Sequence, residues 1–121
     1  MNAKELMIGD WVKIQGYDGL RITAINKSYV NFDKRWAGAK LGEINPIPLT
    51  PEILKKNGFR KESYIEVVGG LDTYYLGEEI GSFRIHRLQE GYYQFGPAKI
   101  RNVHELQHAM RLCGIEKEVE L

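Results

Sequence analysis

The chain has 121 residues, of which 43% are hydrophobic and 27% are charged, and this length is too short for two well-buried cores. One cysteine, Cys113, excludes an intramolecular disulfide, and its position beside Met110 and Leu112 predicts a small buried hydrophobe. No apolar run approaches the length that spans a bilayer, and no apolar signal core follows the first residues. We therefore expect a single cytoplasmic domain over residues 1–121, with no membrane partner.

The net charge of +1 is distributed unevenly along the chain. Residues 1–62 hold 11 Lys/Arg and 7 Asp/Glu, whereas residues 63–121 hold 6 and 9. Such an asymmetry can mark a face for nucleic acid or for an acidic partner. A difference of this size is also common as an incidental feature, so both interpretations stay open at this point.

Residues 1–45 are predicted to form short strands with turn residues between them. Apolar and polar side chains alternate in three segments, 10–14, 20–25 and 28–33. This period of two is typical of strands with one buried and one solvated face. Short meandering strands often curl into a small barrel, and residues 8–12 resemble the first strand of an SH3-like barrel. We therefore expect an N-terminal SH3-like β half-barrel.

A loop is predicted over 34–45, and residues 46–49 are expected to be extended because proline fixes φ and lacks an N–H donor. A short helix should then begin after Thr50, with a capping hydroxyl, a proline at the first helical position and an acid in the first turn. Asn57 and Gly58 predict its end.

Residues 46–121 are predicted to hold this helix, an antiparallel sheet and a C-terminal helix. The predicted strands are 59–60, 64–68, 71–76, 82–88 and 92–95, with tight turns at 69–70 and 89–91. The second helix is predicted over 103–113, with Asn102 as its cap and Glu105 as the acid of a capping box. Residues 115–121 can form a last edge strand. The fold class is therefore α+β.

Three segments carry a family resemblance: residues 5–12 (ELMIGDWV), 47–59 (IPLTPEILKKNGF) and 103–107 (VHELQ). In order and spacing they resemble a family of small uncharacterised proteins from Bacteroides-type gut bacteria and their phages and mobile elements. The resemblance implies a compact α+β fold and a bacterial or phage cytoplasmic setting. It brings no catalytic residues to carry over, and members of that family more often have Asn where this chain has His108.

The sharpest motif is HELQH at residues 104–108. On a helix, His104 and His108 lie one turn apart on one face, where they can bind zinc, and Glu105 can serve as general base for a metal-bound water. This motif makes a zinc-dependent hydrolase the alternative function.

Three observations disfavour that zinc site. Only 13 residues follow His108, which leaves little chain for a third ligand, and Arg111 and Gly114 stand where an extended motif needs other residues. Glu105 has a simpler role as the capping acid. The helical period also places Val103, Leu106, Ala109, Met110 and Cys113 on the core side and the imidazoles toward solvent. We therefore expect a solvated helix face, with no metal, no cofactor and no catalytic residues.

A loop rich in basic and aromatic residues is the second candidate site. Its residues are Lys34, Arg35, Trp36 and Lys40, with Lys55, Lys56, Arg60 and Lys61 expected nearby. Cations bind phosphates and an exposed indole stacks on bases, so this set is a possible footprint for nucleic acid. The alternative is a solvated loop whose Trp36 folds back over the core.

A tyrosine set is the third candidate: Tyr64, Tyr74, Tyr75, Tyr92 and Tyr93. On adjacent strands these rings can line a binding face, although tyrosines in sheets more often pack the ring and solvate the hydroxyl. Together the patterns predict a non-enzymatic binding or accessory protein. A protein partner ranks ahead of nucleic acid, and the oligomeric state stays open.

Overall fold

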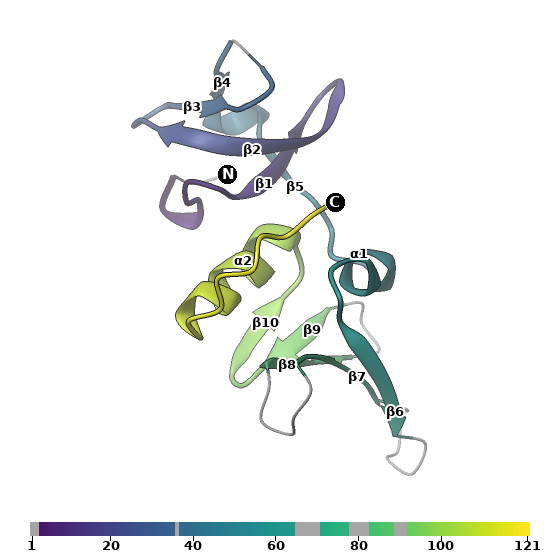
Figure 1. The fold of residues 1–121 in the computed structure, drawn as a ribbon. Coiled ribbons are helices and arrows are strands. Elements are labelled where there is room, and N and C mark those ends of the chain that lie inside the picture. The colour runs from purple at the N-terminus through teal and green to yellow at the C-terminus, as the bar shows by residue number, and fades with distance from the viewer. Residues whose placement is uncertain (1–2, 36, 65–70, 78–82, 89–91) are drawn as a thin grey trace. The chain divides into compact units, whose positions relative to one another are not determined.

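A computed structural model describes residues 3–35, 37–64, 71–77, 83–88 and 92–121. The fold is mixed α+β, with two antiparallel five-stranded sheets and a C-terminal helix (Figure 1). The chain divides into two compact units, Met1–Pro48 with Asn102–His104, and Leu49–Arg101 with Glu105–Leu121. That the two units together form the single domain expected over residues 1–121 stays a prediction. No helix in the described part of the chain is both long and apolar enough to cross a membrane.

The sheet of the first unit has the order β4-β3-β2-β1-β5. Its strands are β1 (Trp11–Ile14), β2 (Tyr17–Ile25), β3 (Tyr29–Phe32), β4 (Ala39–Lys40) and β5 (Asn45–Pro46). Every pair is antiparallel, and the β1–β2 and β2–β3 pairs each contain a register shift. The alternation predicted for the first three strands is confirmed, because Val12, Ile14, Leu20, Ile22 and Val30 all enter the buried core. The sheet is not closed into a barrel.

The predicted loop over 34–45 is only partly irregular. It contains β4, a 3₁₀ turn (Leu41–Glu43) and the start of β5. Very short edge strands give too weak an alternation to be recognised, since two residues carry no period. The backbone at Gly38 passes so close to β3 that a Cβ there would lie 2.6 Å from Asn31 Oδ1 and 2.9 Å from the Val30 carbonyl oxygen.

The sheet of the second unit is a meander in the order β10-β9-β8-β7-β6. Its strands are β6 (Arg60–Tyr64), β7 (Leu71–Leu76), β8 (Phe83–Arg87), β9 (Tyr93–Phe95) and β10 (Ala98–Ile100). The predicted strands that coincide with β7, β8 and β9 are confirmed, whereas β10 was not predicted. The predicted turns at 69–70 and 89–91, and most of the strand predicted over 64–68, lie outside the described residues.

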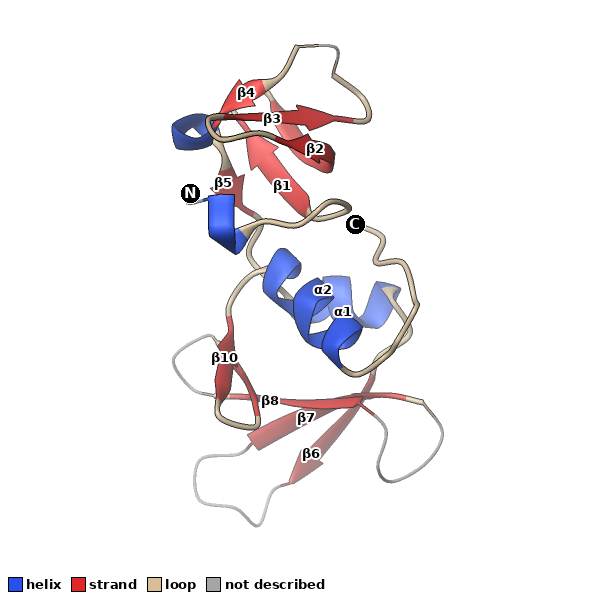
Figure 2. Ribbon diagram, turned by 90° about the vertical axis from the view of Figure 1, so that its left-hand side faces the viewer, coloured by secondary structure: helices blue, strands red, loops and turns tan. Residues whose placement is uncertain are grey.

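Helix α1 (Pro51–Lys56) begins and ends as its capping residues predict. Thr50 Oγ1 accepts a hydrogen bond from the Ile53 backbone N–H at 3.3 Å. The chain leaves the helix through Asn57 and then Gly58, whose φ of 85° favours glycine. In the second unit, α1 and the part of α2 (Val103–Leu112) from Glu105 onward cover one face of the sheet (Figure 2).

The helix-facing side of this second sheet is an aromatic core. Phe83 makes an edge contact with Phe59, with ring centroids 6.1 Å apart, and stacks on Phe95 at 5.0 Å. Tyr74 and Tyr93 meet edge to face at 5.8 Å, and both are 1% exposed. The described helices of this unit lie over this aromatic face, and none of them covers the opposite face of the sheet (Figure 2).

The last residues are held by side-chain contacts and form no strand, so the predicted edge strand at 115–121 is wrong. The buried Asn57 donates through Nδ2 to the Glu120 carbonyl oxygen at 2.7 Å and accepts from the Glu120 N–H at 2.7 Å. Lys56 Nζ donates to the Leu121 carbonyl oxygen. An amide side chain thereby occupies the place where a neighbouring strand would pair with Glu120.

The predicted orientation of α2 is wrong at both ends. His104 is 4% exposed, although the period placed it toward solvent, and Cys113 is exposed, although the period placed it in the core. The prediction assumed a single buried stripe. Here Gln107 is buried along with Leu106, so more than one side of the helix is covered, while its last turn is exposed.

Candidate nucleic-acid interface

The face of the second sheet opposite the helices carries a row of cations around a tyrosine. The strand register places Arg60 of β6 and Arg84 of β8 on either side of Tyr75 of β7. Directly opposed residues on neighbouring strands have Cβ atoms about 5 Å apart, so Arg60, Tyr75 and Arg84 lie side by side across three strands of this face. Arg60 is exposed, and Tyr75 and Arg84 are half-buried.

A second row crosses all five strands beside the first. Its members, in spatial order, are Glu62, Thr73, His86, Gln94 and Lys99. Thr73 Oγ1 and His86 Nδ1 lie 2.9 Å apart in a hydrogen bond, which fixes the orientation of the imidazole. Gln94 and Lys99 are exposed. Polar groups able to donate and accept hydrogen bonds therefore fill the middle of this face.

A second tyrosine with cations lies where β9 begins and β10 ends. Lys99 Nζ is 5.0 Å from the centroid of the Tyr92 ring, and the Arg101 guanidinium carbon is 5.6 Å from it. Cations at such distances are attracted to the face of an aromatic ring. The Tyr92 ring is half-buried, and both cations are exposed.

The charge on this outer face is strongly positive among the described residues. Its cations are Arg60, Arg84, Lys99 and Arg101, and its one acid is Glu62. Asp72 alternates with Thr73 and so belongs to the other face, where its carboxylate pairs with Lys61 Nζ at 3.5 Å. Glu66, Glu78, Glu79 and Glu90 belong to connections outside the described residues.

The structure divides the predicted basic site between the two units. Lys34, Arg35 and Lys40 lie in the first unit, whereas Lys55 and Lys56 lie on α1 in the second. Trp36 lies outside the described residues. The predicted basic residues therefore belong to two separate units, and their gathering into one site stays a prediction.

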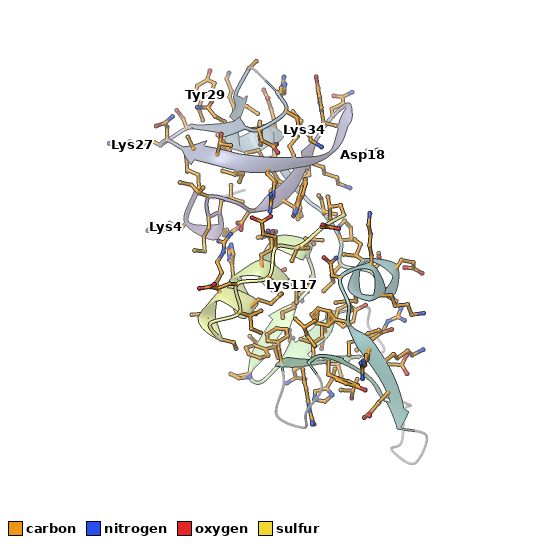
Figure 3. All side chains as sticks on the ribbon, viewed as in Figure 1. Lys4, Asp18, Lys27, Tyr29, Lys34 and Lys117 are labelled. Carbon is orange, nitrogen blue, oxygen red and sulfur yellow. The ribbon has the colours of Figure 1, made fainter. Side chains whose placement is uncertain are left out.

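Within the loop of the first unit, the cations have different surroundings. Lys34, labelled in Figure 3, is exposed, and so is Lys40. The Arg35 guanidinium carbon lies 5.5 Å from the centroid of the Tyr17 ring. An acid, Asp33, precedes Lys34 in the sequence, and its carboxylate accepts a hydrogen bond from the Arg21 backbone N–H at 3.2 Å. Among the described residues, this loop therefore carries three cations and one acid, whereas the outer face of the second sheet carries four cations and one acid.

The charge asymmetry read from the two halves of the sequence does not follow the two units. The first unit holds seven Lys/Arg and five Asp/Glu, and the second holds ten and eleven. Neither unit is strongly basic as a whole. A basic surface in this protein therefore has to come from the arrangement of charges on one face.

The HELQH helix gives no metal centre in the described residues. Glu105 Oε1 accepts a hydrogen bond from the Arg101 backbone N–H at 3.2 Å. The predicted capping box has Glu105 bonded to the N–H of Asn102, the next residue along the chain. His104 is buried and His108 is half-buried. Among the residues that the structure describes, no three His, Cys, Asp or Glu side chains are grouped as metal ligands.

The predicted tyrosine set is divided between the two faces of the second sheet. Tyr74 and Tyr93 belong to the aromatic core, and burial raises the pKa of the Tyr93 hydroxyl to about 12, with Tyr74 adding to the shift. Tyr75 and Tyr92 belong to the outer face. The side chain of Tyr64 lies outside what the structure describes.

Sequence reasoning named Arg60 only as a neighbour of the basic loop, and it did not predict four residues of the outer face: Arg84, His86, Lys99 and Arg101. The available signal was the alternation of Arg84 and His86 with the buried Phe83 and Ile85 within β8. Alternation assigns a residue to a face, but it does not identify its neighbours on the adjoining strands.

Comparisons of the chain with protein-family models, with curated proteins and with solved structures give no match.

Proposed function

We propose that this protein is a non-enzymatic nucleic-acid-binding protein, and that the outer face of the β6–β10 sheet is its contact surface. The observation that carries the proposal is the row in which Arg60 and Arg84 flank Tyr75, on a face with four cations and one acid among the described residues. Cations release counterions from phosphates, and interleaved aromatic rings offer surfaces on which bases stack.

A nucleic acid fits this face better than a folded protein partner does. Protein interfaces are depleted in charge at their centre, whereas here the centre of the face is crossed by charged and hydrogen-bonding side chains. Nucleic-acid interfaces are more polar and much more positive than protein interfaces.

We also propose the fold type of the first unit and the kind of organism that the sequence predicts. The first unit is an SH3-like half-barrel, supported by the order β4-β3-β2-β1-β5, in which the fifth strand returns to pair with the first. The resemblance of residues 5–12, 47–59 and 103–107 supports a cytoplasmic protein of a Bacteroides-type bacterium, its phages or its mobile elements.

The test measures the binding of fluorescein-labelled oligonucleotides of about 20 nucleotides by anisotropy, while salt is raised from about 50 to about 200 mM. Each phosphate contact contributes about −0.7 to the slope of log K against log salt for a single strand, so the slope should lie between about −2 and −3. The double variant Arg60→Gln/Arg84→Gln should make that slope shallower by about 1.4.

The matched control removes the same charge elsewhere. Lys34→Gln/Lys40→Gln alters the loop of the first unit and should leave affinity and slope within about twofold of the unaltered protein. If this control loses binding while Arg60→Gln/Arg84→Gln retains it, the loop is the site and the outer face is not. Absence of oligonucleotide binding even at about 50 mM salt overturns the proposed function.

A further inference from the structure

The outer face offers two aromatic platforms in addition to its charges. Tyr75 stands between Arg60 and Arg84, and Tyr92 lies near Lys99 and Arg101. Both rings are half-buried, so each is held by its neighbours while part of it meets solvent. A ring held in this way can stack on a base at a small cost in side-chain entropy.

The spacing of the platforms suits an extended strand. Along the strands Tyr75 and Tyr92 are two rows apart, with the row of Thr73, His86 and Gln94 between them. Across the sheet they lie on β7 and just before β9, two strands apart. With about 3.3 Å per residue along a strand and about 4.8 Å between strands, the separation of their Cα atoms is roughly 16 Å.

Duplex nucleic acid cannot use these platforms. Its bases are already stacked on each other, and their edges are read by an α-helix or a two-stranded ribbon that enters a groove. On this face the described strands lie side by side in one sheet, with both helices on its other side (Figure 2). A single strand, in contrast, has base faces available for stacking and flexible phosphates that can reach cations beside each ring.

We infer that the outer face binds single-stranded nucleic acid, with one base stacked on Tyr75 and a second taking the place of Lys99 or Arg101 over the Tyr92 ring. The phosphates then lie beside the flanking cations. The inference rests on the proposed function and names its substrate class. His86, oriented by Thr73, and Gln94 lie between the platforms, where their polar atoms face a base edge or a sugar.

The experiment compares a labelled single strand of about 12 nucleotides with the duplex of the same sequence at fixed salt. We expect the single strand to bind at least about tenfold more tightly. Tyr75→Leu should weaken single-strand binding by about 5- to 100-fold and leave duplex binding unchanged. Tyr75→Phe, which retains the ring, should stay within about twofold.

A loss that came only from altered folding would have a different signature. Tyr75→Leu removes no charge, so the salt slope of single-strand binding should be unchanged, and its melting temperature reports whether the sheet is intact. Tyr92→Leu, at the residue just before β9, provides a second variant with the same expected pattern if Tyr75→Leu fails to fold.

Three outcomes separate the two proposals. Tighter binding of the single strand, with loss in the leucine variants and retention in Tyr75→Phe, supports both. Equal or tighter binding of the duplex, still weakened by Arg60→Gln/Arg84→Gln, overturns the inference and leaves the proposed function in place. Absence of binding to either oligonucleotide overturns both.

Discussion

Replacing Asn57 by alanine should detach the C-terminal residues from α1 and measurably destabilise the protein. The side chain is 3% exposed and makes three short hydrogen bonds, to the Ile53 carbonyl oxygen at 2.8 Å and to the Glu120 carbonyl oxygen and N–H at 2.7 Å each. A hydrogen bond contributes a net of about 1 kcal/mol. The Ile53 carbonyl keeps its bond from the Asn57 backbone N–H, so the main loss falls on Glu120.

The free energy of unfolding of Asn57→Ala should therefore fall by about 2 kcal/mol. For a chain of this length that corresponds to a drop of about 8 °C in melting temperature. Chemical denaturation measures the free energy, and amide hydrogen exchange at Glu120 measures the local contact. In the unaltered protein this amide should be protected, and in the variant its protection should be lost.

Two further variants separate hydrogen bonding from packing. Asn57→Asp keeps the shape but turns a carboxylate oxygen toward two carbonyl oxygens at a helix C-terminus, so it should be at least as destabilising as alanine. Asn45→Ala is the matched control, because that exposed amide makes a 3.4 Å contact with the Glu43 carbonyl oxygen and should cost less than about 0.5 kcal/mol. A milder effect for Asn57→Asp than for Asn57→Ala would refute the role of the amide donor.

Two other substitutions each test one unit: Tyr93→Phe in the second unit and Gly38→Ala in the first. Tyr93→Phe should raise stability by about 1 kcal/mol, because the buried Tyr93 hydroxyl has no hydrogen-bond partner among the described residues. The folded-state pKa of about 12 exceeds the usual 10.0, so the stability linked to neutral Tyr93 is complete below pH 10 and is lost from pH 10 to 12. Thermal melts should show that the stability of Tyr93→Phe falls less over this range, and equal falls would contradict the assignment. Gly38→Ala should destabilise the first unit by about 1 to 3 kcal/mol, because its Cβ would meet the Val30 carbonyl oxygen and Asn31. A neutral effect in urea denaturation would show that this backbone can move aside.

Local chemistry was sufficient to predict the elements whose ends are fixed by their own residues. Thr50 and Gly58 delimit α1 because a capping hydroxyl and a left-handed glycine act within one turn of the chain. Alternation identified β1 and β3 in the same way, since a period of two can be recognised within each short segment.

Predictions failed where distant segments decide burial. His104 sits on the polar side of α2 by its period, yet it is buried, because helix faces are covered by elements that a single helix pattern does not specify. The residues 115–121 alternate like a strand, but Asn57 supplies the pairing partner in place of a strand. Strand β10 has three residues, too few for a period to be recognised.

The outer face is a property of register, which is why neither charge nor alternation revealed it. Arg84 would face the same side of the sheet if β8 slipped by two residues, but it would then lie opposite Thr73 and leave Tyr75 without its second guanidinium. The arrangement of cation, ring and cation thus depends on the pairing that joins β6, β7 and β8. Single-strand affinity should consequently respond to changes that shift this pairing even when every side chain of the face is retained.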